Sequence, residues 1–159
     1  MRKRFLSTVL VLIMLLSLAP MSALADDTFR SGDFTFVIET GVACVKKYNG
    51  SSASVTVPSK VEYDGVTYKV RNIHQDAFKN CTTIQKLVLP ETVNRIGKQA
   101  FANCTSLNSI TINGDLNGVY TVDNTFYNIG ANSDYLNVTF GPEVTAIPSN
   151  LFDLSLIHI

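Results

Sequence analysis

Few side chains in this sequence are of the types that most often carry chemistry. Histidine occurs only as His74 and His158, and the cysteines are Cys44, Cys81 and Cys104. No Gly-x-Ser-x-Gly motif is present, and no pair of carboxylates recurs at a spacing that would hold the two together. The cysteines lack nearby histidines, which argues against a zinc site, and His74 is expected to be a solvated side chain. We therefore assign no catalytic residue and expect neither an enzyme nor a bound cofactor.

Two short stretches imitate functional motifs. Residues 89–93, LPETV, are close to a sortase sorting signal, but the fifth residue is Val rather than Gly and no apolar tail with basic residues follows. Residues 113–118, NGDLNG, partly match a calcium loop, with Asp115 and Asn117 as oxygen ligands. The first ligand is a neutral Asn and the twelfth position is Asn124, so charge is missing where Ca²⁺ needs it. We interpret the two stretches as a strand end and a solvated turn.

A repeat organises the middle of the chain. Residues 77–90 read AFKNCTTIQKLVLP, and residues 100–112 read AFANCTSLNSITI. Aligning these two stretches superposes their apolar positions without a gap, while the polar positions between them vary. Each unit carries an apolar row that it cannot bury alone, so stacked units would remove these rows from water. The predicted repeat core consists of the aligned pairs Ile73 and Ile96, Phe78 and Phe101, Cys81 and Cys104, Ile84 and Leu107, Leu87 and Ile110, and Leu89 and Ile112.

Each unit ends in a strand. The spacing Leu107-x-x-Ile110-x-Ile112 finishes in period-two alternation, and in the preceding unit Pro90 stops the strand because it lacks an N–H. The phrase L-x-x-L-x-L at a period of about 20–29 residues is the leucine-rich-repeat signature. With its Ala-Phe pair and its Cys, the fuller pattern IxxxAFxNCTxLxxIxLPxxVxxI resembles the BspA-like leucine-rich repeats of bacterial surface proteins. The resemblance implies a repeat solenoid, mainly β with short helical or turn segments, whose stacked coils have about 23 residues.

Weaker copies extend the repeat in both directions. Upstream, Val55 and Val57 align with the strand residues of the clear units, and an insertion that includes a predicted small hairpin over residues 63–68 separates this copy from the next. Downstream, the phenylalanines keep the register at nearly constant spacings, through Phe78, Phe101, Phe126 and Phe152. Residues 55–153 are therefore predicted to be BspA-like repeats.

The N-terminal region has two parts. Residues 1–25 combine a basic start, an apolar run and the small-x-small sequence Ala-Leu-Ala, which together are typical of a secretory signal peptide. A membrane anchor would need about 18 or more apolar residues, and Pro20 ends this run early, so we expect no membrane span in the mature chain. Residues 26–54 alternate with a turn near Gly41 and are predicted to form an N-terminal cap hairpin and the first coil.

Residues 154–159, LSLIHI, break the pattern. No polar capping unit follows Phe152, and a solenoid that stops on a bare apolar face should aggregate. One reading frame of a common transposon-end sequencing adapter translates to the same six residues. We interpret them as an adapter artefact or a truncated end, with natural sequence stopping at Asp153. The alternative is a genuine final strand.

The cysteines have structural interpretations. Cys81 and Cys104 occupy one repeat position, so they should lie on adjacent coils about 5 Å apart. That separation permits a disulfide in an exported protein, but a reduced Cys also fills a buried ladder position as a small hydrophobe, and we favour stacked thiols. Cys44 alternates with Ala43 and Val45, so it is expected to face outward as an unpaired thiol if they face the core.

Charge and composition exclude some classes of partner. Three of the 13 basic residues lie in the predicted signal peptide, which leaves 10 against 13 acidic residues and a net charge of −3. From Phe101 onward there is no Lys or Arg, against five acidic residues. Nucleic-acid binding, which needs clustered basic side chains, is therefore not expected.

The outward positions of the strands form a candidate binding face. Short hydroxyl and amide groups on a rigid ladder suit an extended or flat partner, because little side-chain entropy is lost on binding. The alternative is that these side chains only solvate the sheet. The two predicted rows are Ser54, Lys86, Ser109 and Asn137, and Thr56, Val88, Thr111 and Thr139.

The resemblance to BspA-like proteins implies a secreted or cell-surface protein that binds an extracellular protein or glycan and acts in adhesion. Two alternatives stay open. The chain could be the N-terminal accessory repeat region of a larger secreted enzyme, such as a peptidase or cell-wall hydrolase, whose catalytic domain is missing. It could also be a structural surface spacer.

Overall fold

The computed structural model describes residues 28–116, 125–147 and 151 of the 159-residue chain. These residues form strands joined by turns, and none of them is helical. The predicted signal peptide and residues 154–159 lie outside the described residues. The strands are β1 (Thr28–Ser31), β2 (Phe34–Glu39), β3 (Val42–Tyr48), β4 (Ser54–Thr56), β5 (Lys60–Tyr63), β6 (Val66–Ile73), β7 (Lys86–Leu89), β8 (Arg95–Ile96), β9 (Ser109–Ile112) and β10 (Asn137–Phe140).

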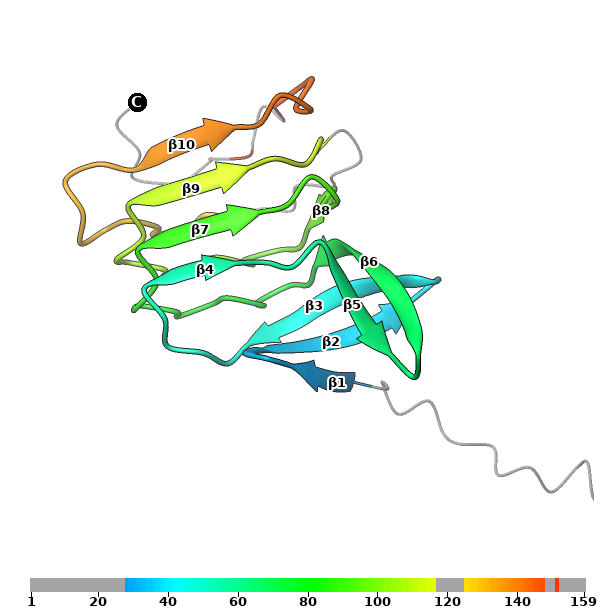
Figure 1. Cartoon of the computed structure of the whole chain (residues 1–159). Helices are drawn as coiled ribbons and strands as arrows, with labels where there is room; N and C mark the ends of the chain where they lie inside the picture. The colour runs from blue at the N-terminus through cyan, green and yellow to red at the C-terminus, as the bar shows by residue number, and fades with distance from the viewer. Residues whose placement is uncertain (1–27, 117–124, 148–150, 152–159) are drawn as a thin grey trace, which may run out of the picture.

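One sheet is built by the repeats. Its strands lie in the order β10, β9, β7 and β4, all parallel, and Figure 1 shows them stacked one above another. The register matches the sequence repeat, since Leu87 lies opposite Val55 on one side and Ile110 on the other. Each coil returns the chain to the repeat sheet, and equivalent residues of successive coils point into the core. The expected solenoid of stacked coils is confirmed.

A column of aromatic rings runs through the core. The ring centroids of Phe78 and Phe101 are 5.2 Å apart, and those of Phe101 and Phe126 are also 5.2 Å apart. Tyr48 extends the column toward the N-terminus, with its ring 5.5 Å from that of Phe78. All four side chains are buried. The period of the sequence therefore places equivalent rings in contact, at separations typical of favourable aromatic pairs.

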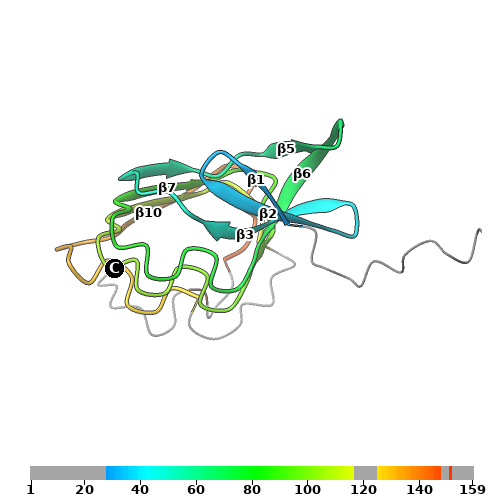
Figure 2. The ribbon, with the colours of Figure 1, turned by 90° about the horizontal axis from the view of Figure 1, so that it is seen from below.

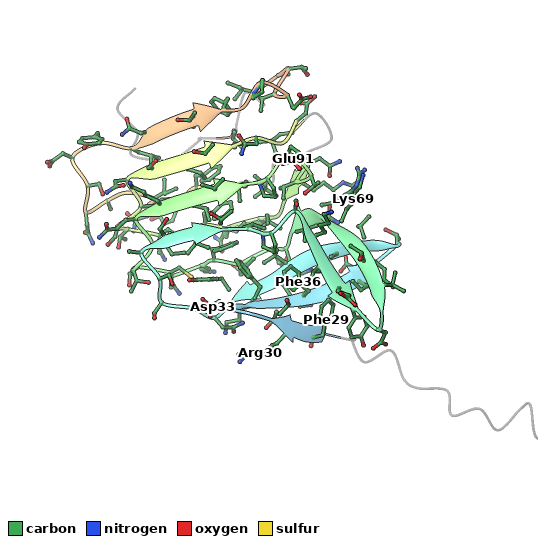
Figure 3. The ribbon with its side chains drawn as sticks, viewed as in Figure 1. Phe29, Arg30, Asp33, Phe36, Lys69 and Glu91 are labelled. Atoms are coloured by element: carbon green, nitrogen blue, oxygen red, sulfur yellow. The ribbon has the colours of Figure 1, made fainter. Side chains whose placement is uncertain are left out.

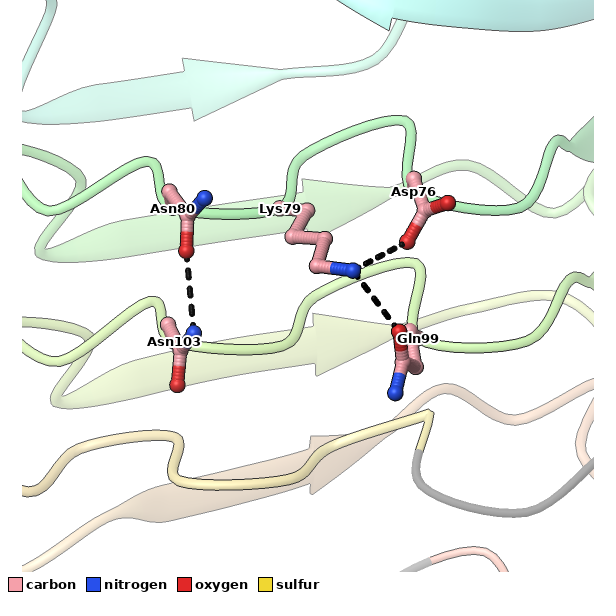
Figure 4. A network of polar contacts seen from close by, with 5 residues as sticks. All are labelled: Asp76, Lys79, Asn80, Gln99 and Asn103. Carbon is pink, nitrogen blue, oxygen red and sulfur yellow. Dashed lines mark hydrogen bonds and ion pairs between the residues drawn. The ribbon is translucent and has the colours of Figure 1, made fainter.

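Turns occupy the side of each coil that faces away from the repeat sheet (Figure 2). Asn80, Asn103 and Asn128 adopt left-handed backbone conformations there, with φ of 62°, 60° and 54°. Asparagine tolerates this region better than most residues. The Asn103 amide donates to Asn80 Oδ1 at 2.9 Å (Figure 4). The Asn128 amide donates in the same way to Asn103 Oδ1 at 3.0 Å. The Asn of the repeat thus forms a hydrogen-bonded ladder along the solenoid.

A second link between the coils lies beside this ladder. Lys79 Nζ contacts Asp76 Oδ1 at 3.1 Å within its own turn and donates to Gln99 Oε1 of the next coil at 2.8 Å (Figure 4). Backbone bonds join the same turns, because Phe78 N–H donates to the Ala100 carbonyl at 2.8 Å. Contacts between coils therefore fix the turns. A helix, whose hydrogen bonds are internal, would not link neighbouring coils in this way.

The N-terminal cap is larger than the predicted hairpin. β1, β2 and β3 form an antiparallel meander, with the predicted turn at Gly41 between β2 and β3. β3 then pairs in parallel with β6, and β6 pairs with β8. The cap and the repeats consequently share one six-stranded sheet. Phe34 of β2 packs against the rings of Tyr48 and Phe78, so the cap covers the N-terminal end of the aromatic column.

The inserted hairpin is also present. β5 and β6 pair antiparallel, and Asp64 and Gly65 form the bend with φ of 50° and 73°. The hairpin starts next to the end of β4 and extends away from the repeat sheet, past the strands of the N-terminal cap (Figure 1). In the part of the chain that the structure describes, there is no helix long and apolar enough to cross a membrane.

Candidate functional site

The structure aligns the two predicted rows on the outer side of the repeat sheet. Strand pairing places Ser54, Lys86, Ser109 and Asn137 side by side, and it places Thr56, Val88, Thr111 and Thr139 side by side. The intervening residues Leu87 and Ile110 are buried, as alternation along a strand requires. The eight side chains therefore share one face of four parallel strands, which we call the strand face.

Small polar groups dominate the strand face. Lys86 is its only charged side chain and is exposed, whereas Val88 and Thr111 near the middle are half-buried. The outer strands β4 and β10 carry exposed residues in both rows. The strand face is a shallow surface with hydrogen-bonding groups along it, and it suits contact with a flat or extended partner better than enclosure of a small molecule.

The predicted repeat core is buried with one exception. Eleven of its twelve residues are at most 2% exposed, and Cys81 is half-buried at the edge of the core. Cys81 and Cys104 are free thiols. Cys104 Sγ donates to the Phe78 carbonyl oxygen at 3.2 Å, and burial raises the pKa of the Cys104 thiol to about 12. A thiol held in its neutral form in this way is a poor nucleophile.

Cys44 does not face solvent, so that expectation was wrong. Its side chain is fully buried, although it points to the opposite side of β3 from Ala43 and Val45. β3 lies between β2 and β6, and side chains from both flanks cover the thiol. Asn72 Nδ2 donates to Cys44 Sγ at 3.1 Å, and Sγ lies 3.3 Å from Glu39 Oε2. Burial raises the pKa of this thiol to about 11.

The remaining candidate residues form no metal site in the described part of the chain. No group of three His, Cys, Asp or Glu side chains comes together there. Asp115 accepts a hydrogen bond from Thr145 Oγ1 at 2.9 Å. Asn117 and Asn124, the other residues of the partial calcium motif, lie outside the described residues. His74 is half-buried, and its backbone N–H donates to the Val45 carbonyl at 2.9 Å.

A pocket that the sequence did not reveal lies near the ends of the repeat strands. Its volume is about 670 Å³, and it lies between the β5–β6 hairpin and the turns that follow β4, β7 and β9. The inserted hairpin was visible in the sequence, but the turns it approaches come from later repeats. We call this cavity the hairpin pocket. It is lined by Ser59, Lys60, Thr67, Lys69, Arg71, Glu91, Thr92, Asn94 and Asp115.

Comparison with known proteins supports the repeat assignment. The model of the BspA type leucine rich repeat region matches residues 48–158 in six copies. None of the curated proteins matches the chain.

Three solved structures are similar. A leucine rich cell surface protein of Faecalibacterium prausnitzii A2-165 is 24% identical with a TM-score of 0.53, over 73% of this chain and 30% of that one. A leucine-rich repeat protein of Bacteroides capillosus is 26% identical with a TM-score of 0.52, over 70% and 97%. A leucine-rich repeat protein of Bacteroides ovatus is 30% identical with a TM-score of 0.50, over 55% and 24%. The chain thus spans under a third of two of these proteins and nearly all of the third.

Proposed function

Because the chain belongs to the BspA-type leucine-rich repeat family, we propose that it is an exported recognition module that binds an extracellular protein or glycan through the strand face. The signal peptide predicted over residues 1–25 supports export. The similar protein of Faecalibacterium prausnitzii is described as a cell surface protein, which agrees with this location.

The observation that carries the proposal is the register of the repeat sheet. Parallel strands lie about 4.8 Å apart, so each row presents its groups at regular intervals along a fixed line. These side chains are mostly Ser, Thr and Asn, which lose little rotamer entropy when a partner orders them. A rigid, regularly spaced polar surface can form many modest contacts at once with an extended protein segment or a glycan chain.

A second candidate is an accessory role in a larger secreted protein. This chain spans 30% of the Faecalibacterium prausnitzii protein and 24% of the Bacteroides ovatus protein, so such repeats occur within longer chains. A peptidase or cell-wall hydrolase domain beyond Asp153 would make this region an accessory part of an enzyme. The sequence of the full gene, read past this codon, distinguishes the two roles. A passive surface spacer is the third possibility and is tested by the binding experiment.

The binding experiment uses the purified full chain on arrays of host matrix proteins and cell-wall glycans. A double variant, Lys86→Glu with Thr111→Arg, reverses the charge and adds bulk on the strand face. Both side chains project from the outer side of the sheet, so the fold should be retained. We expect binding to weaken at least about tenfold, because several contacts on a flat surface are disrupted together.

The matched control is Thr83→Arg with Lys98→Glu. Both residues are exposed on turns outside the repeat sheet, and the substitutions are of the same kind. Far-UV circular dichroism and thermal unfolding establish that both double variants fold. Unchanged binding by the strand-face variant would remove this surface from consideration, and absence of any bound partner would favour the spacer.

A further inference from the structure

We propose that the hairpin pocket binds an acidic saccharide, a sugar that carries a carboxylate or a sulfate group in addition to hydroxyls. The site is distinct from the strand face, and the proposal does not depend on what that face binds. Its volume of about 670 Å³ lies within the range of pockets that hold small ligands, roughly 300–1,000 Å³. Its lining residues all carry charged, hydroxyl or amide groups, which can form hydrogen bonds with a polar ligand.

Positive charge is concentrated on the hairpin wall. Lys60 lies directly opposite Lys69 in the antiparallel register, so the two side chains project from the same face of the hairpin. Arg71 is two residues beyond Lys69 and shares that face. Like charges in directly opposed positions destabilise a strand pair. In the described ranges of the chain, none of the three forms an ion pair within 4.0 Å. With Glu91 and Asp115 also among the lining residues, the pocket carries one net positive charge, which a single anionic group of a ligand would balance.

The opposite wall offers groups of a different kind. Glu91, Thr92 and Asn94 come from the turn after β7, and Asp115 comes from the segment after β9. Lys69 and Glu91 lie at the same end of the molecule, on the hairpin and on the repeat turn (Figure 3). Carboxylate and amide oxygens accept hydrogen bonds from sugar hydroxyls, whereas the two carboxylates repel a ligand with many negative charges. One anionic group combined with several hydroxyls fits both walls, and an acidic peptide does not.

The two walls are held in place before any ligand binds. Thr92 Oγ1 donates to the Ser59 carbonyl at 3.3 Å, and Asn94 N–H donates to the Arg71 carbonyl at 3.0 Å. These bonds join the base of the hairpin to the repeat turn on the other side of the pocket.

The far face of the hairpin is anchored as well. Tyr63 stacks on Phe29 of β1 with ring centroids 4.2 Å apart, and Val61 and Val70 are buried. A cavity fixed on both sides loses little conformational entropy on binding, which favours recognition of a polar ligand.

The test is calorimetric titration of the full chain with four probes at low ionic strength. Sialyllactose supplies a carboxylate, and a heparin-derived disaccharide supplies sulfate. Lactose is the neutral counterpart, and a glutamate-rich hexapeptide is the acidic peptide. We expect at least one acidic saccharide to bind at least about tenfold more tightly than lactose or the peptide, since a hydrogen bond to a charged group is worth a factor of this order. The probe that binds shows whether the carboxylate or the sulfate is recognised.

Variants locate the binding. Lys69→Gln with Arg71→Gln should weaken saccharide binding at least about tenfold, because the cationic wall is neutralised. Lys98→Gln removes a charge outside the pocket and should leave binding unchanged, as should the strand-face double variant. Equal binding of lactose, tighter binding of the peptide, no binding of either acidic saccharide, or full binding by the hairpin variant would each overturn the proposal. Because the strand-face variant is measured in the same series, failure here is separable from failure of the proposed function.

Discussion

Replacement of Phe101 by Ala tests whether the aromatic column holds the coils together. Phe101 is fully buried, and its ring centroid lies 5.2 Å from those of Phe78 and Phe126, so it joins its own coil to the coil on each side. In a solenoid each repeat contacts only its neighbours, and the loss of one link cannot be compensated by distant contacts.

The expected cost follows from the area that the ring buries. An aromatic side chain buries roughly 150–250 Å², which at about 25 cal/mol per Å² corresponds to roughly 4–6 kcal/mol. This value is an upper bound because the unfolded chain already buries part of the ring. Phe→Ala changes in protein cores cost about 3–5 kcal/mol. We therefore expect the free energy of unfolding to fall by about 4 kcal/mol, a large share of the ~5–15 kcal/mol typical of a domain.

Urea unfolding followed by far-UV circular dichroism measures this change. The chain has no Trp, so the dichroism of the sheets is the more direct signal. Tyr135→Ala is the control, because it removes an aromatic side chain that is 66% exposed and should change stability by less than about 0.5 kcal/mol. A loss below about 1 kcal/mol for Phe101→Ala would refute the idea that the column stabilises the stack.

Three further changes probe the thiols, the close-packed turns and the Asn ladder. Burial raises the pKa of the Cys104 thiol from 9.0 to about 12, so above pH 9 the thiol is deprotonated in the unfolded state but not in the folded state. The free energy of unfolding should therefore fall as pH rises above about 9, and it should fall less steeply in Cys104→Ala. Gly114→Ala should cost about 3 kcal/mol in urea unfolding because the new Cβ would collide with a backbone carbonyl, whereas Gly65→Ala, in open space at φ 73°, should cost only about 1–2 kcal/mol. Asn103→Ala should lower the free energy of unfolding by about 2 kcal/mol. Asn103→Gly should lower it less, because Gly loses the same ladder bonds but tolerates the φ of 60°. Equal losses for the two variants in thermal unfolding would contradict this.

The repeat units were the most predictable part of the molecule. Equivalent residues one period apart, such as Leu87 and Ile110, were expected in contact and are paired in register. The prediction succeeded because burial of an apolar row depends on a neighbour of the same sequence, so the period alone fixes which residues meet. The Asn at positions 80 and 103 belongs to the repeat motif, but the hydrogen-bonded Asn ladder depends on left-handed turns that composition does not predict.

Predictions for single residues outside the repeats succeeded less well. Alternation placed Cys44 correctly on the other side of β3, but exposure depends on what covers that side. Its cover includes Asn72, which is 28 residues away in the chain. Local pattern gives the direction of a side chain, and only the packing of distant strands gives its environment.

The sequence by itself determined the coils, their register and the residues that stack, because these follow from a short period and from the removal of apolar rows from water. The tertiary structure decided how the cap joins the repeats through β3 and β6, and how the hairpin lines a pocket together with the turns of later coils. Those arrangements rest on contacts between residues with no shared pattern, such as Thr92 with Ser59 and Phe29 with Tyr63. Since no periodicity links such partners, the hairpin pocket exists only once the chain is folded.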